Sequence, residues 1–161
     1  MSQNTDKPAL RFIVKSRIGV ERHVPEPRSK NYVIISITSP GDVDASIPPD
    51  PRLHGVHRLS FVEPDEGNNA QREFTAAEAG GVWSFLSDYV DFVDTVVLHC
   101  DHGACRSPAI AAALSKWLIG DDSTFQSEYA VNPQIFKTLL ETAPQRLKES
   151  RRSAEIARYS P

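Results

Sequence analysis

The sequence contains only two cysteines, Cys100 and Cys105, and both lie in one short run. A disulfide between them would close a tiny loop and join no distant parts of the chain, so it would add little stability. A secreted disulfide scaffold has more cysteines, spread more widely along the sequence. We therefore expect a reducing cytoplasm as the location and a functional role for the two thiols.

Long apolar runs and an excess of basic charge are also missing. No apolar stretch approaches the roughly 18 residues that a membrane-spanning helix needs. Residues 1–8 do not have the charged-then-apolar order of a signal peptide. The formal net charge is −3 at pH 7, whereas proteins that bind nucleic acid or anionic membranes usually carry a basic surplus. We expect neither nucleic acid nor a membrane among the partners.

The composition that remains is typical of a globular domain. The chain has 161 residues, of which 40% are hydrophobic and 24% charged, and these values suit one domain with a real core. The sequence has no internal repeat and no low-complexity block. We expect a single domain over residues 1–161, with residues 1–8 and about 150–161 loosely ordered.

Two segments rich in β-branched residues predict buried strands, at residues 32–37 and 95–99. Weaker strand candidates are residues 11–14 and 57–61. Proline and glycine between these segments indicate loops, because both residues interrupt regular structure.

Three segments predict helices. The first begins near Thr75, whose spacing from Glu78 is that of a capping box. The second covers residues 107–120, with a proline in its first turn and a glycine at its end. The third covers residues 133–142 and has its apolar side chains on one face. Strands that alternate with helices predict a three-layer α/β fold, with a short, mainly parallel sheet and helices on both faces.

The most informative stretch is residues 99–107, His-Cys-Asp-His-Gly-Ala-Cys-Arg-Ser. It connects a predicted strand to a predicted helix. The N–H groups of such a loop and of the first helical turn converge on one spot, and the helix dipole adds positive charge there. Gly103 permits a backbone conformation that residues with a Cβ resist. The sequence therefore predicts a loop that binds phosphate-like anions.

Four residues of this stretch have individual roles in the prediction. We expect the field of the loop to favour the thiolate of Cys100 and so make it a nucleophile. Arg106 carries a planar fork of donors suited to two phosphoryl oxygens. Ser107 can donate a hydrogen bond to the Cys100 sulfur, and His99 fixes the loop by hydrogen bonds rather than moving protons. Arg106 and the amides stabilise charge, so no metal or organic cofactor is needed.

The pattern His-Cys-x-x-Gly-x-x-Arg-Ser resembles the catalytic motif of protein tyrosine and dual-specificity phosphatases. Residues 106–111 are similar to those of small bacterial and phage-type members. The resemblance implies the dual-specificity phosphatase fold and hydrolysis of phosphotyrosine, with phosphoserine and phosphothreonine as further substrates, through a phosphocysteine intermediate. The catalytic residues are then Cys100, Arg106, Ser107 and Asp65. The residues that bind the substrate phosphate are Asp101, His102, Gly103, Ala104, Cys105 and Arg106.

Members of this family protonate the leaving oxygen with an acid on a separate upstream loop. In this chain that loop follows the predicted strand at residues 57–61. Asp65 is the first candidate, because aspartate is the usual acid and Pro64-Asp65 is a loop dipeptide. Glu63 is the second candidate, because family members often place the acid two residues after a strand-ending aromatic such as Phe61. A third interpretation is that both are solvated loop carboxylates.

Cys105 has two interpretations that the sequence leaves open. Low-molecular-weight tyrosine phosphatases also have a cysteine directly before the motif arginine. By that resemblance, Cys105 forms a disulfide with oxidised Cys100 and protects it from further oxidation. The other interpretation is a small buried side chain that packs beneath the loop.

Two other kinds of site compete with this prediction. A zinc site would leave Arg106 beside a cation and would give Gly103 no role. A rhodanese-type sulfur transferase would need neither the His-Cys pair nor the Ser107 hydroxyl. The candidate zinc ligands are His99, Cys100, His102 and Cys105, with His54 and His57 as a second pair.

Asp101 bears on the class of substrate, because its negative charge would repel a multiply phosphorylated inositol head group. We therefore expect a phosphorylated protein or peptide as the partner. Two alternatives remain. One is a module that binds phosphate without turnover, a pseudophosphatase, and the other is a phosphatase that acts on a non-protein phosphate ester.

Overall fold

The computed structural model describes residues 10–22, 30–62, 74–101 and 106–147. The expected loose order of both termini concerns residues outside these ranges. Within them, no helix combines the length and the apolar character that crossing a bilayer requires.

Four parallel strands form one sheet, in the order β1-β4-β2-β3. All four predicted strands are confirmed, and β4 lies in the interior of the sheet. The strand β3 starts four residues earlier than predicted and stops before Phe61, whose ring packs against Phe74 instead. The strands are β1 (Arg11–Ser16), β2 (Tyr32–Thr38), β3 (Leu53–Ser60) and β4 (Thr95–Cys100).

Strand β2 is buried on both of its faces, as the continuous apolar run predicts. Its side chains alternate between two clusters, because successive residues of a strand point to opposite faces. Ile35 and Ile37 belong to the larger cluster beneath the helices. Tyr32 and Ile34 belong to a smaller cluster on the other face, with Val97 of β4.

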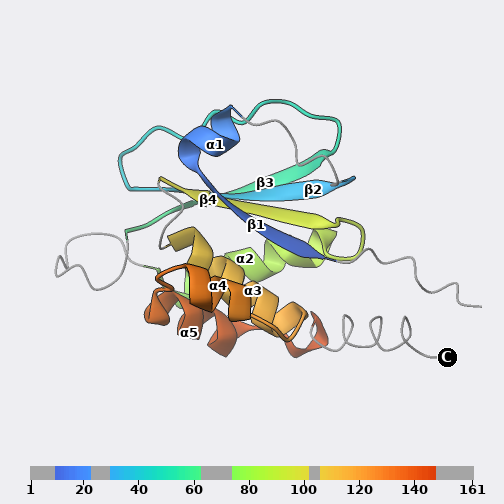
Figure 1. The fold of residues 1–161 in the computed structure, drawn as a ribbon, viewed down its shortest axis with the longest axis vertical. Helices are drawn as coiled ribbons and strands as arrows, with labels where there is room; N and C mark the ends of the chain where they lie inside the picture. The colour runs from blue at the N-terminus through green and yellow to red at the C-terminus, as the bar shows by residue number, and fades with distance from the viewer. Residues whose placement is uncertain (1–9, 23–29, 63–73, 102–105, 148–161) are drawn as a thin grey trace, which may run out of the picture.

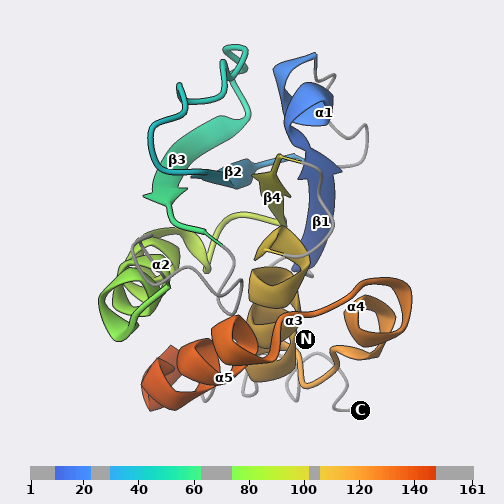
Figure 2. The same ribbon diagram turned by 90° about the vertical axis from the view of Figure 1, so that its left-hand side faces the viewer.

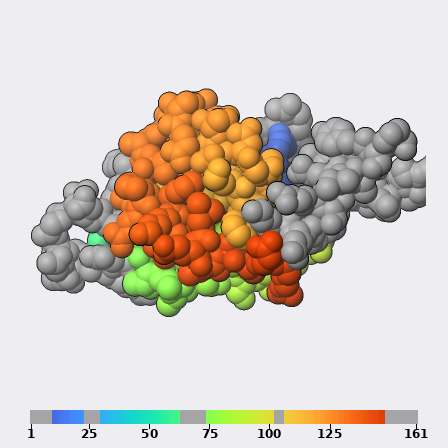
Figure 3. Space-filling view, turned by 90° about the horizontal axis from the view of Figure 1, so that it is seen from below, coloured from blue at the N-terminus to red at the C-terminus, as the bar shows by residue number. Residues whose placement is uncertain are grey.

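Helices lie on both sides of the sheet (Figures 1 and 2). The side with α1 (Arg17–Glu21) also carries the segment that links β2 to β3. The other side carries the remaining helices, which form the continuous surface in Figure 3. They are α2 (Ala76–Tyr89), α3 (Arg106–Leu118), α4 (Ser123–Glu128) and α5 (Pro133–Thr142). The three-layer α/β arrangement with a parallel sheet is therefore confirmed.

The three predicted helices are present, although α3 ends at Leu118, two residues before the predicted end. The backbone N–H of Thr75 donates to the Glu78 carboxylate at 3.0 Å, directly before α2. Helix α3 begins one residue earlier than predicted and is followed by Gly120 in the left-handed region, with a φ of 89°. The bounds of α5 match the prediction. The short helices α1 and α4 were not predicted, since α4 buries no residue and α1 has only five residues.

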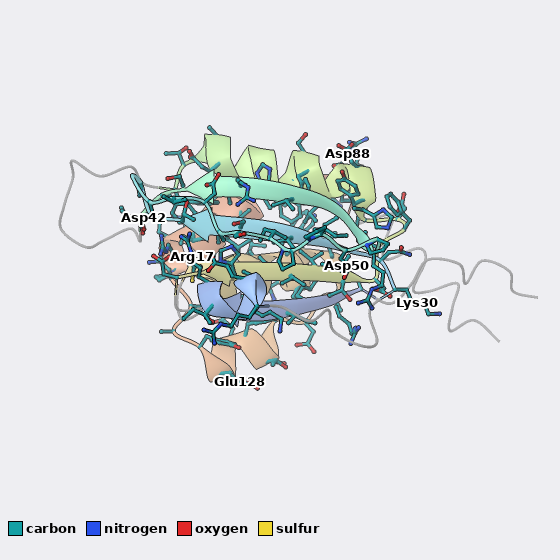
Figure 4. All side chains as sticks on the ribbon, turned by 90° about the horizontal axis from the view of Figure 1, so that it is seen from above. Arg17, Lys30, Asp42, Asp50, Asp88 and Glu128 are labelled. Atoms are coloured by element: carbon teal, nitrogen blue, oxygen red, sulfur yellow. The ribbon has the colours of Figure 1, made fainter. Side chains whose placement is uncertain are left out.

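Because the strands are parallel, all four end at the same edge of the sheet. Figure 4 shows the two ends of the sheet. Arg17 and Asp42 follow β1 and β2 and lie at the carboxyl edge, whereas Lys30 and Asp50 precede β2 and β3 and lie at the opposite edge. The loops at the carboxyl edge are where α/β sheets usually place a ligand site.

The larger buried cluster, on the side of β2 that α2, α3 and α5 cover, supplies a stability prediction. Ile37 is fully buried there, so Ile37→Ala should lower the free energy of unfolding by about 2–5 kcal/mol, through lost burial and the cavity left behind. Val43 is 80% exposed, and Val43→Ala should change it by less than about 0.5 kcal/mol. Urea unfolding of both variants measures the difference. Equal losses would contradict the assignment of Ile37 to the core.

Candidate functional site

The last residue of β4, Cys100, begins the candidate site. Its side chain is buried, and its Sγ lies 3.3 Å from Oγ of Ser107 in the first turn of α3. Ser107 is fully buried. The thiol and the hydroxyl are therefore held in hydrogen-bond contact at the positive, N-terminal end of a 13-residue helix.

The guanidinium of Arg106 is fixed by three hydrogen bonds. Its Nη1 donates to Oγ of Ser39 at 3.2 Å and to the carbonyl oxygen of Phe61 at 2.8 Å. Its Nη2 donates to Oδ2 of Asp101 at 3.2 Å, which also makes an ion pair. The Arg106 side chain is only 11% exposed, so these bonds determine where its charge lies.

Three of the five N–H groups of Arg106 are used in this way. Among the described residues, Nε and the second N–H of Nη2 have no hydrogen-bond partner. These two nitrogens share one edge of the planar group. They form the kind of fork that binds two oxygens of a phosphoryl group at once.

His99 belongs to a buried hydrogen-bonded chain beside the site. The register of β2 and β4 pairs Ser36 with His99, and Nε2 of His99 lies 2.6 Å from Oγ of Ser36. Arg58 Nη1 donates to the same Oγ at 3.4 Å, so the Ser36 hydroxyl hydrogen is directed to His99. Nδ1 of His99 then faces the Cys100 carbonyl oxygen, at 3.5 Å.

The pKa of His99 is lowered, and burial of the ring is the largest cause of this shift. A neutral imidazole fits these hydrogen bonds, because it accepts from Ser36 through Nε2 and carries its hydrogen on Nδ1. His99 therefore holds the end of β4 by hydrogen bonds, and its expected part in fixing the loop stays a prediction.

Several predicted site residues lie outside the described part of the chain. These are His102, Gly103, Ala104 and Cys105 of the loop, and the two candidate acids Glu63 and Asp65. Their roles, and the redox pairing of Cys105 with Cys100, stay predictions.

The two candidate zinc ligands on β3 contact Asn31 and an aromatic ring and do not lie with the cysteine loop in the described residues. His54 is hydrogen-bonded to Asn31 at 2.8 Å, and the ring of His57 stacks on Phe85. In the ranges that the structure describes, no three His, Cys, Asp or Glu residues are grouped as a metal site would require.

Ser39 and the Phe61 carbonyl are parts of the site that the sequence analysis missed as partners of Arg106. Ser39 directly follows β2, and Phe61 directly follows β3. A signal was available, because the first residues after parallel strands share one edge of the sheet. Using that signal requires the strand order, which the sequence alone does not provide.

The fold defined here is that of dual-specificity phosphatases and their relatives. The structure of human DUSP28 matches with a TM-score of 0.56 and 13% identity, over 88% of this chain and 94% of that one. The human tyrosine phosphatase-like serine/threonine/tyrosine-interacting protein matches with a TM-score of 0.55 and 14% identity, over 81% and 89%. No protein-family model and no curated protein sequence matches this chain. At such identities the likeness concerns the fold.

A buried histidine, His99, and a half-buried one, His57, predict how stability depends on pH. Burial lowers the pKa of both His57 and His99 below the usual value of about 6.5. The unfolded chain then binds protons that the folded chain does not, so the free energy of unfolding should fall as pH drops from about 6.5 to 5. Urea unfolding at several pH values measures this fall.

The variant His57→Phe should make that fall smaller, because it keeps a ring against Phe85 and removes the titrating group. As a control, the pH dependence between 7.5 and 8.5 should be the same in both proteins, because the histidines are neutral there in either state. An unchanged fall below pH 6.5 in the variant would contradict the role assigned to His57.

Proposed function

We propose that this protein is a cysteine-dependent phosphatase that hydrolyses phosphotyrosine in proteins, with phosphoserine and phosphothreonine as further candidates. One observation carries the proposal. The Cys100 thiol is in hydrogen-bond contact with the Ser107 hydroxyl at 3.3 Å, and the neighbouring Arg106 has a two-nitrogen edge that no described residue occupies. A nucleophile, an anion clamp and a hydrogen-bond donor to sulfur are the groups that this chemistry needs.

In the first step, the Cys100 thiolate attacks phosphorus in line with the ester oxygen. An S–P bond forms while the P–O bond to the substrate breaks. Arg106 and the loop amides bind the non-bridging oxygens, and their contacts matter most in the transition state. A carboxylic acid, Asp65 or Glu63, gives its proton to the leaving oxygen.

In the second step, water attacks the phosphocysteine and gives up a proton to the same carboxylate. The S–P bond breaks, and inorganic phosphate and the Cys100 thiolate are released. The Ser107 hydroxyl donates a hydrogen bond to the departing sulfur, for which the 3.3 Å contact is a suitable starting distance. Arg106 and the loop amides supply the charge stabilisation in both steps.

The charge at the site supports a singly phosphorylated group on a protein as the substrate. Asp101 is 29% exposed and brings a negative charge next to Arg106. A densely charged ligand such as an inositol polyphosphate would meet repulsion there. The scarcity of cysteine elsewhere in the chain supports a reducing cytoplasm as the location.

The competing function is a non-catalytic module that binds phosphoprotein. The nucleophile, the arginine and the serine are all present, and their contacts count against it. This alternative depends on whether the protein has a general acid, because Asp65 and Glu63 are assigned that role from the sequence alone.

The first test is the variant Cys100→Ser. Hydrolysis of an aryl phosphate such as p-nitrophenyl phosphate at mildly acidic pH should fall by about 10⁴-fold or more, because the nucleophile is lost. Binding of a phosphotyrosine peptide, measured by calorimetry, should persist because Arg106 and the loop amides remain. If the wild type shows no turnover and binds the peptide as well as the variant does, the pseudophosphatase alternative replaces this proposal.

The second test separates the two candidate acids. Asp65→Ala or Glu63→Ala, whichever removes the true acid, should slow turnover of a phosphotyrosine peptide by about 100-fold or more. The other variant serves as the matched control and should keep nearly full activity. Small, equal effects of both substitutions would show that neither carboxyl group is the acid.

A further inference from the structure

Three acceptors surround the Arg106 guanidinium, and each follows a different strand. Ser39 comes after β2, the Phe61 carbonyl after β3, and Asp101 after β4. Only Asp101 belongs to the same loop as the arginine. The position of the guanidinium therefore depends on the assembled sheet and not on the local motif alone.

Ser39 links the other two partners of the guanidinium. Its Oγ accepts from Arg106 Nη1 at 3.2 Å, so its own hydrogen is available to donate. That hydrogen is directed to Oδ2 of Asp101, at 3.4 Å. The same Oδ2 also accepts from Arg106 Nη2 at 3.2 Å. Ser39, Asp101 and Arg106 thus close a ring of three hydrogen bonds.

Asp101 is itself attached to the fold on its other side. Its backbone carbonyl oxygen accepts from the N–H of Arg17 at 3.2 Å, at the junction of β1 and α1. The Ser16 hydroxyl caps α1 at that junction by accepting from the N–H of Gly19 at 3.1 Å. The carboxylate that holds Arg106 therefore has an anchored backbone.

We propose that Ser39 and Asp101 are positioning residues for Arg106. By occupying Nη1 and one N–H of Nη2, they turn the edge formed by Nε and Nη2 toward the site that a phosphoryl group would enter. A guanidinium oriented before binding loses less freedom when it engages the anion. This inference deepens the proposed phosphatase function, and its expected effect on kcat rests on that function. Its expected effect on anion binding does not require the protein to turn over a substrate.

The opposite role for Asp101 would be that of an internal competitor. A carboxylate beside Arg106 would then occupy the cation until a phosphate displaced it. The two roles predict effects of opposite sign when the carboxylate is removed, so one measurement distinguishes them.

The test is tungstate binding to the full chain, measured by calorimetry. Ser39→Ala and Asp101→Ala should each weaken binding by about tenfold, because each removes one acceptor of an Arg106 hydrogen bond together with the Ser39–Asp101 hydrogen bond. Ser39→Thr keeps the hydroxyl and should stay within about threefold of the wild type. Two matched controls lie away from this edge. They are Ser127→Ala on α4 and Asp50→Asn, which breaks an Arg52 ion pair at the amino end of the sheet, and both should bind tungstate as the wild type does.

Steady-state kinetics give a second measurement, which would not change if Ser39 and Asp101 had a merely structural role. With an aryl phosphate, Ser39→Ala and Asp101→Ala should lower kcat by about ten- to a hundredfold and raise KM much less, because orientation matters most in the transition state. Thermal melting of each variant tests whether it is folded. If Asp101→Ala does not fold, Ser39→Ala with its threonine rescue decides alone.

Unchanged or tighter tungstate binding by folded Ser39→Ala and Asp101→Ala would overturn the positioning role. Failure of the wild type to bind tungstate would overturn it as well. The proposed function fails separately. A wild type that binds tungstate without hydrolysing esters loses the phosphatase assignment only, and normal hydrolysis by both variants removes only the positioning role.

Discussion

Parallel pairing makes every strand of the sheet deliver its last residue to the same edge. With β4 between β1 and β2, the thiol at its end lies among residues that come from distant parts of the sequence. Arg17, Ser39, Phe61 and Asp101 each follow one strand, and each contacts the group around Arg106. The chemistry of the loop thus depends on backbone hydrogen bonds of the whole sheet.

The register between β2 and β4 has a second effect, in the interior. It places Ser36 beside His99, so two polar side chains that are fully shielded from water satisfy each other. A buried polar group without a partner costs about 1–3 kcal/mol. A slip by one residue would place these two side chains on opposite faces of the sheet and so separate them. The pair therefore favours one alignment of the strand that ends at the nucleophile.

Much of the fold was predictable from sequence, because its strongest signals are local. The β-branched run of β2, the capping box before α2 and the apolar face of α5 each determine their element over a few residues. The contact of Cys100 with Ser107 was predictable for the same reason, as both flank one short loop. The Ser39 and Phe61 contacts with Arg106 span 67 and 45 residues, and they follow from strand order, which no local pattern encodes.

The contact between Phe61 and Phe74 joins two points of the chain on either side of residues 63–73. Their ring centroids are 4.9 Å apart and both side chains are fully buried. The ends of that segment are therefore fixed by the core, whatever the segment contains. Doubling the length of a loop with fixed ends costs only about 0.6 kcal/mol in closure entropy. A change in the length of that segment would therefore cost the fold little, and its effect would fall on the candidate acids Glu63 and Asp65, which belong to the segment.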